Sequence, residues 1–253
     1  MTARFYYPDR MIPGQIVTLP TSTSHHVTCV LRLKQGDKIT LFNGEGGEFS
    51  GIIKCTDKSR NTVMISQFHE IERESPLSIS LVQAVSSNEK MDWIIQKSVE
   101  LGVNSIQPVT ANRSVVRLSK ERANKRLLHW QQVIIAACEQ CGRNRIPKLL
   151  PLLTLSDWFS QQFEDKQKNI ENRHAHNFLL SVTANERLSG FPLPMTETPL
   201  ILLVGPEGGF TIEEEKTAYA AGFVSICLGQ RILRTESAAL AAIAAMQTLW
   251  GDY

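Results

Sequence analysis

The sequence lacks the long apolar runs that membrane proteins need. No stretch of about 18 apolar residues occurs in the 253 residues, so no membrane span is expected. The start of the chain, MTARFYYPDR, lacks the apolar centre of a signal peptide. Apolar residues make up 42% of the chain and charged residues 21%, which is typical of soluble globular proteins. We therefore expect a cytoplasmic protein of one large or two smaller domains.

Cysteine is scarce, and its placement argues against several kinds of site. The five cysteines are scattered and odd in number, which favours reduced thiols over a disulfide framework. Cys138 and Cys141 have the C-x-x-C spacing, but no second pair completes the ligand set of a structural zinc site. The pair also ends a long helical pattern, whereas a thioredoxin-type pair opens a helix after a strand. We expect no metal site and interpret this spacing as chance.

The net charge is small overall but unevenly spread along the chain. The whole sequence carries +2. Residues 110–150 hold nine Lys and Arg against two Asp and Glu, a net charge of +7, whereas residues 151–253 hold seven against twelve, a net charge of −5. A dense basic band favours a polyanionic partner, because clustered cations release counterions from phosphates. A solvated helix face would show the same pattern, so the charge alone leaves both interpretations open.

The pattern of residues 1–75 is typical of a small barrel or folded β-sheet. Four β-rich runs follow one another, namely GQIVTLP, DKITLFNG, GEFSGIIKCT and TVMISQFHEI. Among them only TSHHVTCVLR has a helical pattern, with N-cap candidates at Ser22, Thr23 and Ser24. The charged stretch IERESP, which ends at Pro76, is interpreted as a linker.

From residue 77 the pattern alternates between strand and helix. We expect strands at SISLVQAV, NSIQPVTA, IPKLLPLL, NFLLSV, PLILLVG and FVSICLG. We expect helices at NEKMDWIIQKSVELG, KERANKRLLHWQQVIIAACEQCG, TIEEEKTAYAAG and ESAALAAIAAMQTLW, and a loop at EDKQKNIENRHAH. This order predicts an α/β domain with a mainly parallel sheet. Trp93 and Trp130 fall at apolar helical positions and are expected in the core.

A glycine-rich turn follows one of these strands, in the stretch LLVGPEGGFT. It has neither the Lys-Ser/Thr of a Walker A loop nor the G-x-G-x-x-G of a dinucleotide site. The glycines of 205–209 let a ligand approach the backbone closely, and Pro206 stiffens the bend. Thr211 and Glu214 have the spacing of a capping box. The glutamates at 213–215 would repel a phosphate, so we expect a ligand without a phosphate near this helix end.

A second glycine loop ends the strand FVSICLG and continues through QRILRTE into an alanine-rich helix. Because the carboxyl ends of parallel strands share one edge of a sheet, we expect the two loops to face each other there. Ligands bind at that edge in such folds. The last helix is apolar or small nearly all round, which predicts burial against the sheet or against a second subunit.

The two glycine loops, LLVGPEGGFTIEE and LGQRILRTESAALAA, resemble those of the knotted methyltransferase superfamily known as SPOUT. The resemblance is closest to the bacterial 16S rRNA (uracil-N3)-methyltransferases and extends over almost the whole chain. The stretch HHVTCVLRLKQGD resembles that family's histidine-arginine segment. In the family this segment belongs to an N-terminal RNA-binding barrel similar to PUA domains. The family's central motifs resemble EKMDWIIQKSVELGVNSIQPVTANRSV and CEQCGRNRIPKL.

The resemblance implies a definite fold and activity. Residues 1–75 would form a PUA-like β-barrel, and residues 76–253 a SPOUT domain whose C-terminal segment makes a trefoil knot. The cofactor would be S-adenosyl-L-methionine. The protein would act as a homodimer and would bind neither a membrane nor DNA. The substrate would be N3 of a uridine at the decoding site of the small ribosomal subunit, uridine 1498 of the 16S rRNA.

The same resemblance places the cofactor against three segments at the sheet edge. The residues implied are Leu180, Ser181, Leu203, Val204, Gly205, Pro206, Glu207, Gly208, Leu228, Gly229, Ile232, Leu233, Arg234, Glu236, Ser237 and Ala238.

Methylation at N3 of uracil requires loss of the imide proton, and the anion that forms needs a neighbouring cation. Arg234, in the loop before the last helix, is our candidate for that cation. The alternative is a salt bridge from Arg234 to Glu236 or Glu207 that braces the loop. Glu207 and Glu139 are candidate general bases.

Basic residues of both regions are candidates for contact with RNA, although each could be an ordinary surface charge. His25 and His26 are adjacent, so they cannot share a metal ion on one helix face, and capping or RNA contact is favoured for them. The candidates are Arg4, Arg10, His25, His26, Arg32, Lys34, Arg113, Arg117, Arg143 and Arg145.

Two other functions remain open at this point. The same fold could methylate a ribose hydroxyl or a different base of RNA. The protein could also be a non-catalytic ribosome-assembly factor that binds rRNA, although both glycine loops are intact. An NTP-dependent enzyme is disfavoured by the missing Lys-Ser/Thr.

Overall fold

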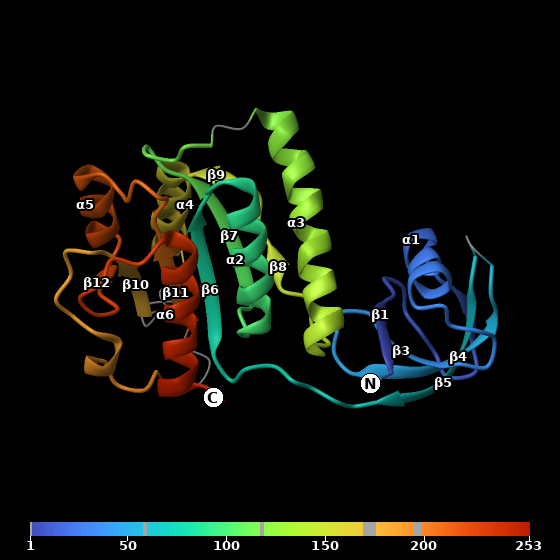
Figure 1. Ribbon diagram of the computed structural model, residues 1–253. Coiled ribbons are helices and arrows are strands. Elements are labelled where there is room, and N and C mark those ends of the chain that lie inside the picture. The colour runs from blue at the N-terminus through green and yellow to red at the C-terminus, as the bar shows by residue number, and fades with distance from the viewer. Residues whose placement is uncertain (1, 58–59, 117–118, 169–175, 195–198) are drawn as a thin grey trace. The chain divides into compact units, whose positions relative to one another are not determined.

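Contacts within the chain divide it into two compact units (Figure 1). The first unit is Met1–Glu74 with Cys138–Ile146, and the second is Ser75–Ala137 with Pro147–Tyr253. The return of Cys138–Ile146 to the first unit was not anticipated from the sequence. The computed structural model describes residues 2–57, 60–116, 119–168, 176–194 and 199–253.

The first unit is built on a five-stranded sheet in the order β1-β3-β4-β5-β2. Only β1 and β3 pair in parallel. The sequence indicated every strand except β1, which is short and buries only Phe5. The strands are β1 (Ala3–Tyr6), β2 (Ile16–Thr18), β3 (Lys38–Phe42), β4 (Glu48–Cys55) and β5 (Thr62–His69).

The helical segment expected in this unit is present as α1 (Thr21–His25) and a π-helical turn, η1 (His26–Val30). Strand side chains alternate between core and surface, as the period of two residues requires. The core therefore contains Phe5, Ile39 and Leu41, together with Val27 of the π-helical turn.

The second unit contains a seven-stranded sheet in the order β12-β10-β11-β6-β7-β8, with β9 also paired to β7. Every pair in it is parallel, as the alternation of strands and helices predicted. The strands are β6 (Ser78–Ala84), β7 (Ser105–Thr110), β8 (Lys148–Leu149), β9 (Leu153–Thr154), β10 (His176–Leu180), β11 (Pro199–Val204) and β12 (Val224–Ile226).

Helices cover this sheet. α2 and α6 lie side by side, and α4 and α5 contact each other (Figure 1). Trp158 and Phe159 of α4 pack in one core with Leu179 and Leu203 of the sheet. No described helix meets the length and hydropathy of a membrane span. The helices are α2 (Asn88–Glu100), α3 (Lys120–Cys141), α4 (Leu155–Lys168), α5 (Ile212–Ala220) and α6 (Thr235–Trp250), with a short 3₁₀ turn, η3 (Leu188–Gly190).

Four local predictions were wrong. Helix α1 has Pro20 at its N-cap position, so none of Ser22, Thr23 and Ser24 caps it. The loop expected from residue 164 begins inside α4, whose buried Leu155, Trp158 and Phe159 have helical spacing. The single strand expected at IPKLLPLL is two short strands, because Pro151 has no N–H to donate to a ladder. Trp93 is 51% exposed, whereas Trp130 is buried as expected. Trp93 lies on an uncovered face of α2, where the Lys97 ammonium is 5.1 Å from its ring centre.

Candidate functional site

The carboxyl ends of four parallel strands meet at one edge of the second unit's sheet. β6 ends at Ala84, β10 at Leu180, β11 at Val204 and β12 at Ile226. The Ser181 amide donates to the Ile226 carbonyl at 3.1 Å, so the chain leaving β10 stays beside β12. The segments proposed to hold a cofactor therefore begin at one edge, as the parallel topology requires.

The glycine turn after β11 is rigid and open. Gly209 has φ +67° and Gly229, in the second loop, has φ +102°, a region that favours glycine. No atom lies within 4 Å of where a Cβ would stand at either position. The predicted capping box is confirmed: the Glu214 amide donates to Thr211 Oγ1 at 3.2 Å, and the Thr211 amide donates to Glu214 Oε2 at 2.8 Å.

A part-buried hydrogen bond joins the two glycine loops. Thr235 Oγ1, in the first turn of α6, donates to the Gly205 carbonyl at 2.6 Å. Gln83, in β6, donates through Nε2 to Thr235 Oγ1 at 3.1 Å. The prediction that the two loops meet at the sheet edge is confirmed by these contacts.

Lys90 forms a second link between the loops. Its ammonium lies 3.3 Å from Glu207 Oε1 and 3.6 Å from Glu236 Oε2. The sequence analysis missed this residue, although a lysine in the first turn of a helix opposes the helix dipole and signals a nearby anion. Because Lys90 holds both carboxylates, the proposed brace from Arg234 to these glutamates is not needed.

Hydrogen bonding keeps Glu207 ionised. Burial raises the pKa of this carboxyl, but hydrogen bonds from its own amide, from Lys90 and from the Ser87 amide outweigh burial and leave the pKa below its ordinary value. A carboxylate with a lowered pKa is a weak proton acceptor. Glu207 is thus better suited to holding the loops than to acting as a base.

The other two catalytic candidates lie in different places. Arg234 is exposed at the N-cap position of α6, at the end of the second loop. Glu139 belongs to the first unit, where Oε1 accepts a hydrogen bond from the Tyr6 amide at 2.9 Å. Burial raises the pKa of Glu139. The structure therefore brings Arg234 and Glu207 to one sheet edge and gives Glu139 a partner in the first unit.

Arg113 also contacts the glycine turn. Its guanidinium donates to the carbonyls of Gly208, at 3.2 Å, and Phe210, at 3.1 Å. From its charge alone, we predicted that Arg113 contacts RNA. In the structure its guanidinium holds the glycine turn through these two hydrogen bonds.

Two family models match this chain. The RNA methyltransferase domain matches residues 73–247, and the RNA methyltransferase PUA domain matches residues 19–60. The chain belongs to the RNA methyltransferase family. The resemblance stated from the sequence is thereby confirmed, as are the parallel α/β sheet and the PUA-like N-terminal region.

Relatives in this RNA methyltransferase family match over most of their length. The Ribosomal RNA small subunit methyltransferase E of Buchnera aphidicola subsp. Schizaphis graminum is 37% identical, over 98% of this chain and 97% of the relative. That of Bacillus subtilis is 29% identical, over 88% of this chain and 86% of the relative. The crystal structure of the Neisseria gonorrhoeae protein of the same name, bound to S-adenosyl methionine, is 41% identical with a TM-score of 0.89, and covers 100% of both chains. A Legionella pneumophila methyltransferase in complex with the cofactor SAM is 38% identical with a TM-score of 0.91, and also covers 100% of both chains.

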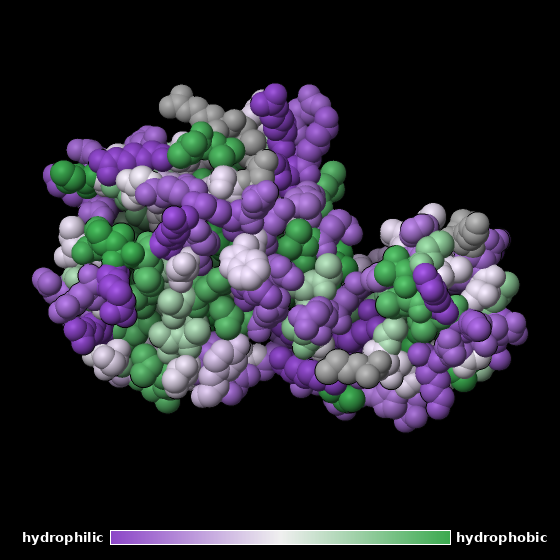
Figure 2. Space-filling view, viewed as in Figure 1, coloured by the Kyte–Doolittle hydropathy of each residue, from purple (hydrophilic) through white to green (hydrophobic). Residues whose placement is uncertain are grey.

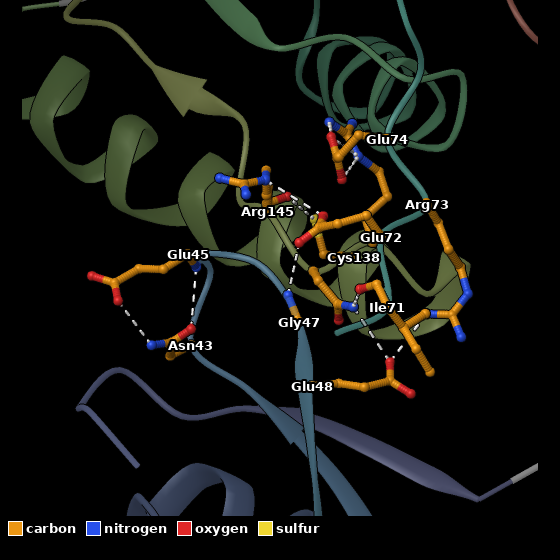
Figure 3. Close-up of polar contacts among 12 residues, drawn as sticks. Asn43, Glu45, Gly47, Glu48, Ile71, Glu72, Arg73, Glu74, Cys138 and Arg145 are labelled. Carbon is orange, nitrogen blue, oxygen red and sulfur yellow. Dashed lines mark hydrogen bonds and ion pairs between the residues drawn. The ribbon is translucent and has the colours of Figure 1, made fainter. Parts of the chain in front are cut away.

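In this RNA methyltransferase, an ion-pair network holds the segment Cys138–Ile146 within the first unit (Figure 3). Arg143 is 4% exposed and pairs with Glu74, and Arg145 lies 3.4 Å from Glu72. Arg4 pairs with Glu48 at 2.6 Å and donates to the Arg143 carbonyl at 2.9 Å.

For Arg4 and Arg143, the predicted RNA contact would compete with ion pairs inside the protein. Their guanidinium groups are buried among protein partners, so they cannot meet a phosphate without breaking those ion pairs. The sequence shows positive charge but not burial, and the two arginines look no different from exposed ones.

The remaining RNA candidates of this unit are accessible. Arg10, His25, His26, Arg32 and Lys34 are exposed, and Arg145 is half exposed beside Glu72. Arg32 has φ +54°, a strained conformation for a residue with a Cβ. Arg117 lies outside the described residues.

Cys138 and Cys141, the pair with C-x-x-C spacing, lie at the end of α3. Burial raises the pKa of the Cys138 thiol to about 12, so it is not a nucleophile at neutral pH. Neither Cys138 nor Cys141 forms a disulfide. No cluster of His, Cys, Asp and Glu in the described residues could hold a metal ion.

We expect acid to destabilise the first unit through Glu48. Burial raises the pKa of this carboxyl, but Arg73 and Arg4 outweigh burial and leave the net pKa below the ordinary value of 4.5. The folded protein thus binds this proton more weakly than the unfolded chain does. The stabilisation is present above the ordinary pKa and is lost as the pH falls through the folded-state pKa.

Urea unfolding over an acidic pH series measures this loss. Glu48→Gln should flatten the pH dependence, while Glu70→Gln, a change at an exposed glutamate, should leave it as in the wild type. Equal slopes for Glu48→Gln and the wild type would contradict the expectation.

Proposed function

We propose that this RNA methyltransferase transfers the methyl group of S-adenosyl-L-methionine to N3 of a uridine in the 16S rRNA of the small ribosomal subunit. The observation that carries the proposal is the joining of the two glycine loops at one sheet edge, through Thr235 and Gly205, in a chain of this family. Relatives named for small-subunit rRNA methylation, and related structures with the bound cofactor, support it.

The residues at the sheet edge fit a nucleoside-bearing cofactor. Val182 and Ile232, in the loops that leave β10 and β12, are 72% and 82% exposed and offer apolar surface for a purine. The open glycines, Gly209 and Gly229, leave backbone groups accessible. We propose that the cofactor is held by Leu180–Ser181, by Leu203–Gly208, and by Leu228, Gly229 and Ile232–Arg234 with Glu236–Ala238.

The chemistry requires a cation more than it requires a strong base. The cofactor supplies a sulfonium methyl group that is already electrophilic. As the imide proton leaves N3, negative charge spreads over the uracil carbonyl oxygens. Arg234 stabilises that charge, since a nearby cation favours the ionised form of an acid. Glu207 and Glu139 remain the candidate proton acceptors, and the lowered pKa of Glu207 makes it the weaker of the two.

The two regions of the chain would have different functions, RNA binding and catalysis. Residues 1–75 would bind RNA through the exposed set Arg10, His25, His26, Arg32 and Lys34. Residues 76–253 would form the knotted catalytic domain.

We further propose a homodimer that uses the face of α2 and α6. Apolar side chains gather over α6 in Figure 2. Trp93 is 51% exposed and Leu249 is 44% exposed on these two helices. A second copy would cover this surface.

Calorimetry and mass spectrometry test the function. The wild-type protein should bind S-adenosylmethionine saturably, and small subunits from a strain lacking the enzyme should gain one N3-methylated uridine in vitro. Absence of cofactor binding would overturn the enzyme assignment and leave an rRNA-binding protein. A methyl group on ribose or on another base would instead show that the acceptor is wrong.

A further inference from the structure

Gln83 is a buried amide directly behind the glycine turn. It lies near the end of β6, opposite Val204, the residue that precedes Gly205. Its side chain is fully buried, with Nε2 donating to the Ala84 carbonyl at 3.0 Å and to Thr235 Oγ1 at 3.1 Å. The amide interrupts the apolar end of its strand, between Val82 and Ala84, so it needs an explanation.

The direction of each hydrogen bond follows from the donors available. The single hydroxyl hydrogen of Thr235 is donated to the Gly205 carbonyl at 2.6 Å. The hydroxyl oxygen can then only accept from Gln83, so Gln83 must present its NH₂ group to it. The three groups form a relay with one orientation, Gln83 to Thr235 to Gly205.

The relay fixes the peptide at the start of the glycine turn. The residue after Gly205 is Pro206, which has no N–H, so the bend cannot be anchored through that amide. Anchoring therefore falls on the Gly205 carbonyl.

The orientation of Gln83 has a cost within the fold. Gln83 Oε1 is buried and has no hydrogen-bond partner among the described residues. Buried polar groups are nearly always paired, so an unpaired oxygen indicates that the position of the amide nitrogen matters.

We propose that Gln83 is a positioning residue for the methyl donor. Through Thr235 it fixes the Gly205 carbonyl, and with it the backbone of the glycine turn on which the cofactor lies. The inference rests on the proposed function, and it assigns to Gln83 a share of cofactor affinity without contact to the cofactor.

The Lys90 link cannot replace the relay. Lys90, Glu207 and Glu236 have side chains that are 29%, 27% and 17% exposed. Both Lys90 contacts join two long side chains, at 3.3 and 3.6 Å, whereas the relay ends on a backbone carbonyl at 2.6 Å. The relay therefore fixes the backbone of the glycine turn more directly than the Lys90 link does.

Gln107 provides a matched control on the neighbouring strand. It is 5% exposed in β7, and its Nε2 donates to the carbonyl of the next residue, Pro108, at 2.8 Å, as Gln83 does to Ala84. Its second bond, at 2.7 Å, goes to the Pro151 carbonyl instead of a glycine loop. Substitution of Gln107 thus reproduces the loss of a buried amide without touching the relay.

The test uses Gln83→Glu, Gln83→Leu, Thr235→Val, Thr235→Ser and Gln107→Leu in the full chain. Gln83→Glu is nearly isosteric and replaces the donating NH₂ group with a carboxylate oxygen, which also adds a charge, whereas Gln83→Leu removes the donor without adding one. We expect the Gln83 variants and Thr235→Val to raise the Kd and KM for S-adenosylmethionine about tenfold, equivalent to about 1.4 kcal/mol. The kcat should stay within about twofold, because the relay does not touch the reacting atoms.

Three further readouts separate positioning from folding. Thr235→Ser, which keeps the hydroxyl, should restore affinity. The double variant Gln83→Leu with Thr235→Val should be no weaker than Thr235→Val alone, since both changes break one relay. Gln107→Leu should lower stability and leave cofactor affinity unchanged.

Wild-type affinity in folded Gln83→Leu would overturn the proposal, as would an equal loss in Gln107→Leu. A wild-type protein that fails to bind S-adenosylmethionine would instead overturn the proposed function. The two failures are therefore distinguishable in the same calorimetry series.

Discussion

Replacement of Arg234 by alanine is expected to lower methyl transfer by about 100- to 1,000-fold, the usual effect of removing one group that stabilises developing charge. Affinity for S-adenosylmethionine should change little. The side chain is exposed, and the residue contributes to α6 through its backbone, where its carbonyl accepts from the Ala238 amide at 2.8 Å. Alanine keeps that backbone bond, so the loop should remain folded.

The charge of Arg234 is not engaged by the glutamates of the two loops. Glu207 and Glu236 both pair with Lys90. A cation engaged by a carboxylate would have little effect on a substrate anion. Arg234 lies at the end of the second glycine loop, which the hydrogen bond from Thr235 to Gly205 holds against the first loop.

Single-turnover kinetics with saturating cofactor measure this effect. Arg234→Lys should recover part of the rate, because it keeps the charge but not the guanidinium fork. Arg187→Ala removes an exposed arginine outside the proposed site and should have near-wild-type activity. A near-normal rate for Arg234→Ala would refute the catalytic role.

Replacement of Arg143 by alanine should lower the free energy of unfolding of the first unit by about 3–5 kcal/mol, as expected when one partner of a buried ion pair is removed. The Arg143 and Glu74 side chains are 5% and 17% exposed. Arg143 also anchors the segment Cys138–Ile146 to this unit. Without it, Glu74 keeps a charge that water reaches poorly.

Amide hydrogen exchange in β1, β4 and β5, together with urea unfolding, reports on this unit directly. Arg145→Ala is the control, because Arg145 and Glu72 are 56% and 36% exposed and such pairs contribute about 0–1 kcal/mol. If the two variants were equally stable, the network would not anchor the segment. If Arg143→Ala lost RNA affinity without losing stability, the result would support the predicted contact between Arg143 and RNA.

Much of the architecture could be predicted because local patterns specify it. The alternation of strands and helices after residue 77 indicated a parallel sheet, and the Thr211 and Glu214 spacing indicated a capping box. Parallel strands place their carboxyl ends at one edge, so the meeting of the two glycine loops followed from topology. Helix α4 was not predicted, although its apolar residues have helical spacing. Strand β1 was not predicted because it has too few buried residues to form a recognisable pattern.

The fold class, the two glycine loops and the family could be predicted from the amino-acid order, because periodicity, turn residues and motifs are local properties. The pairing of charged and polar groups became visible only in the folded protein. Folding buried Arg4 and Arg143 in ion pairs, set Lys90 between two glutamates, and aligned Gln83 with Thr235 and Gly205. These partners lie far apart in the chain, and whether a charge meets water or a carboxylate depends on packing that no local pattern records.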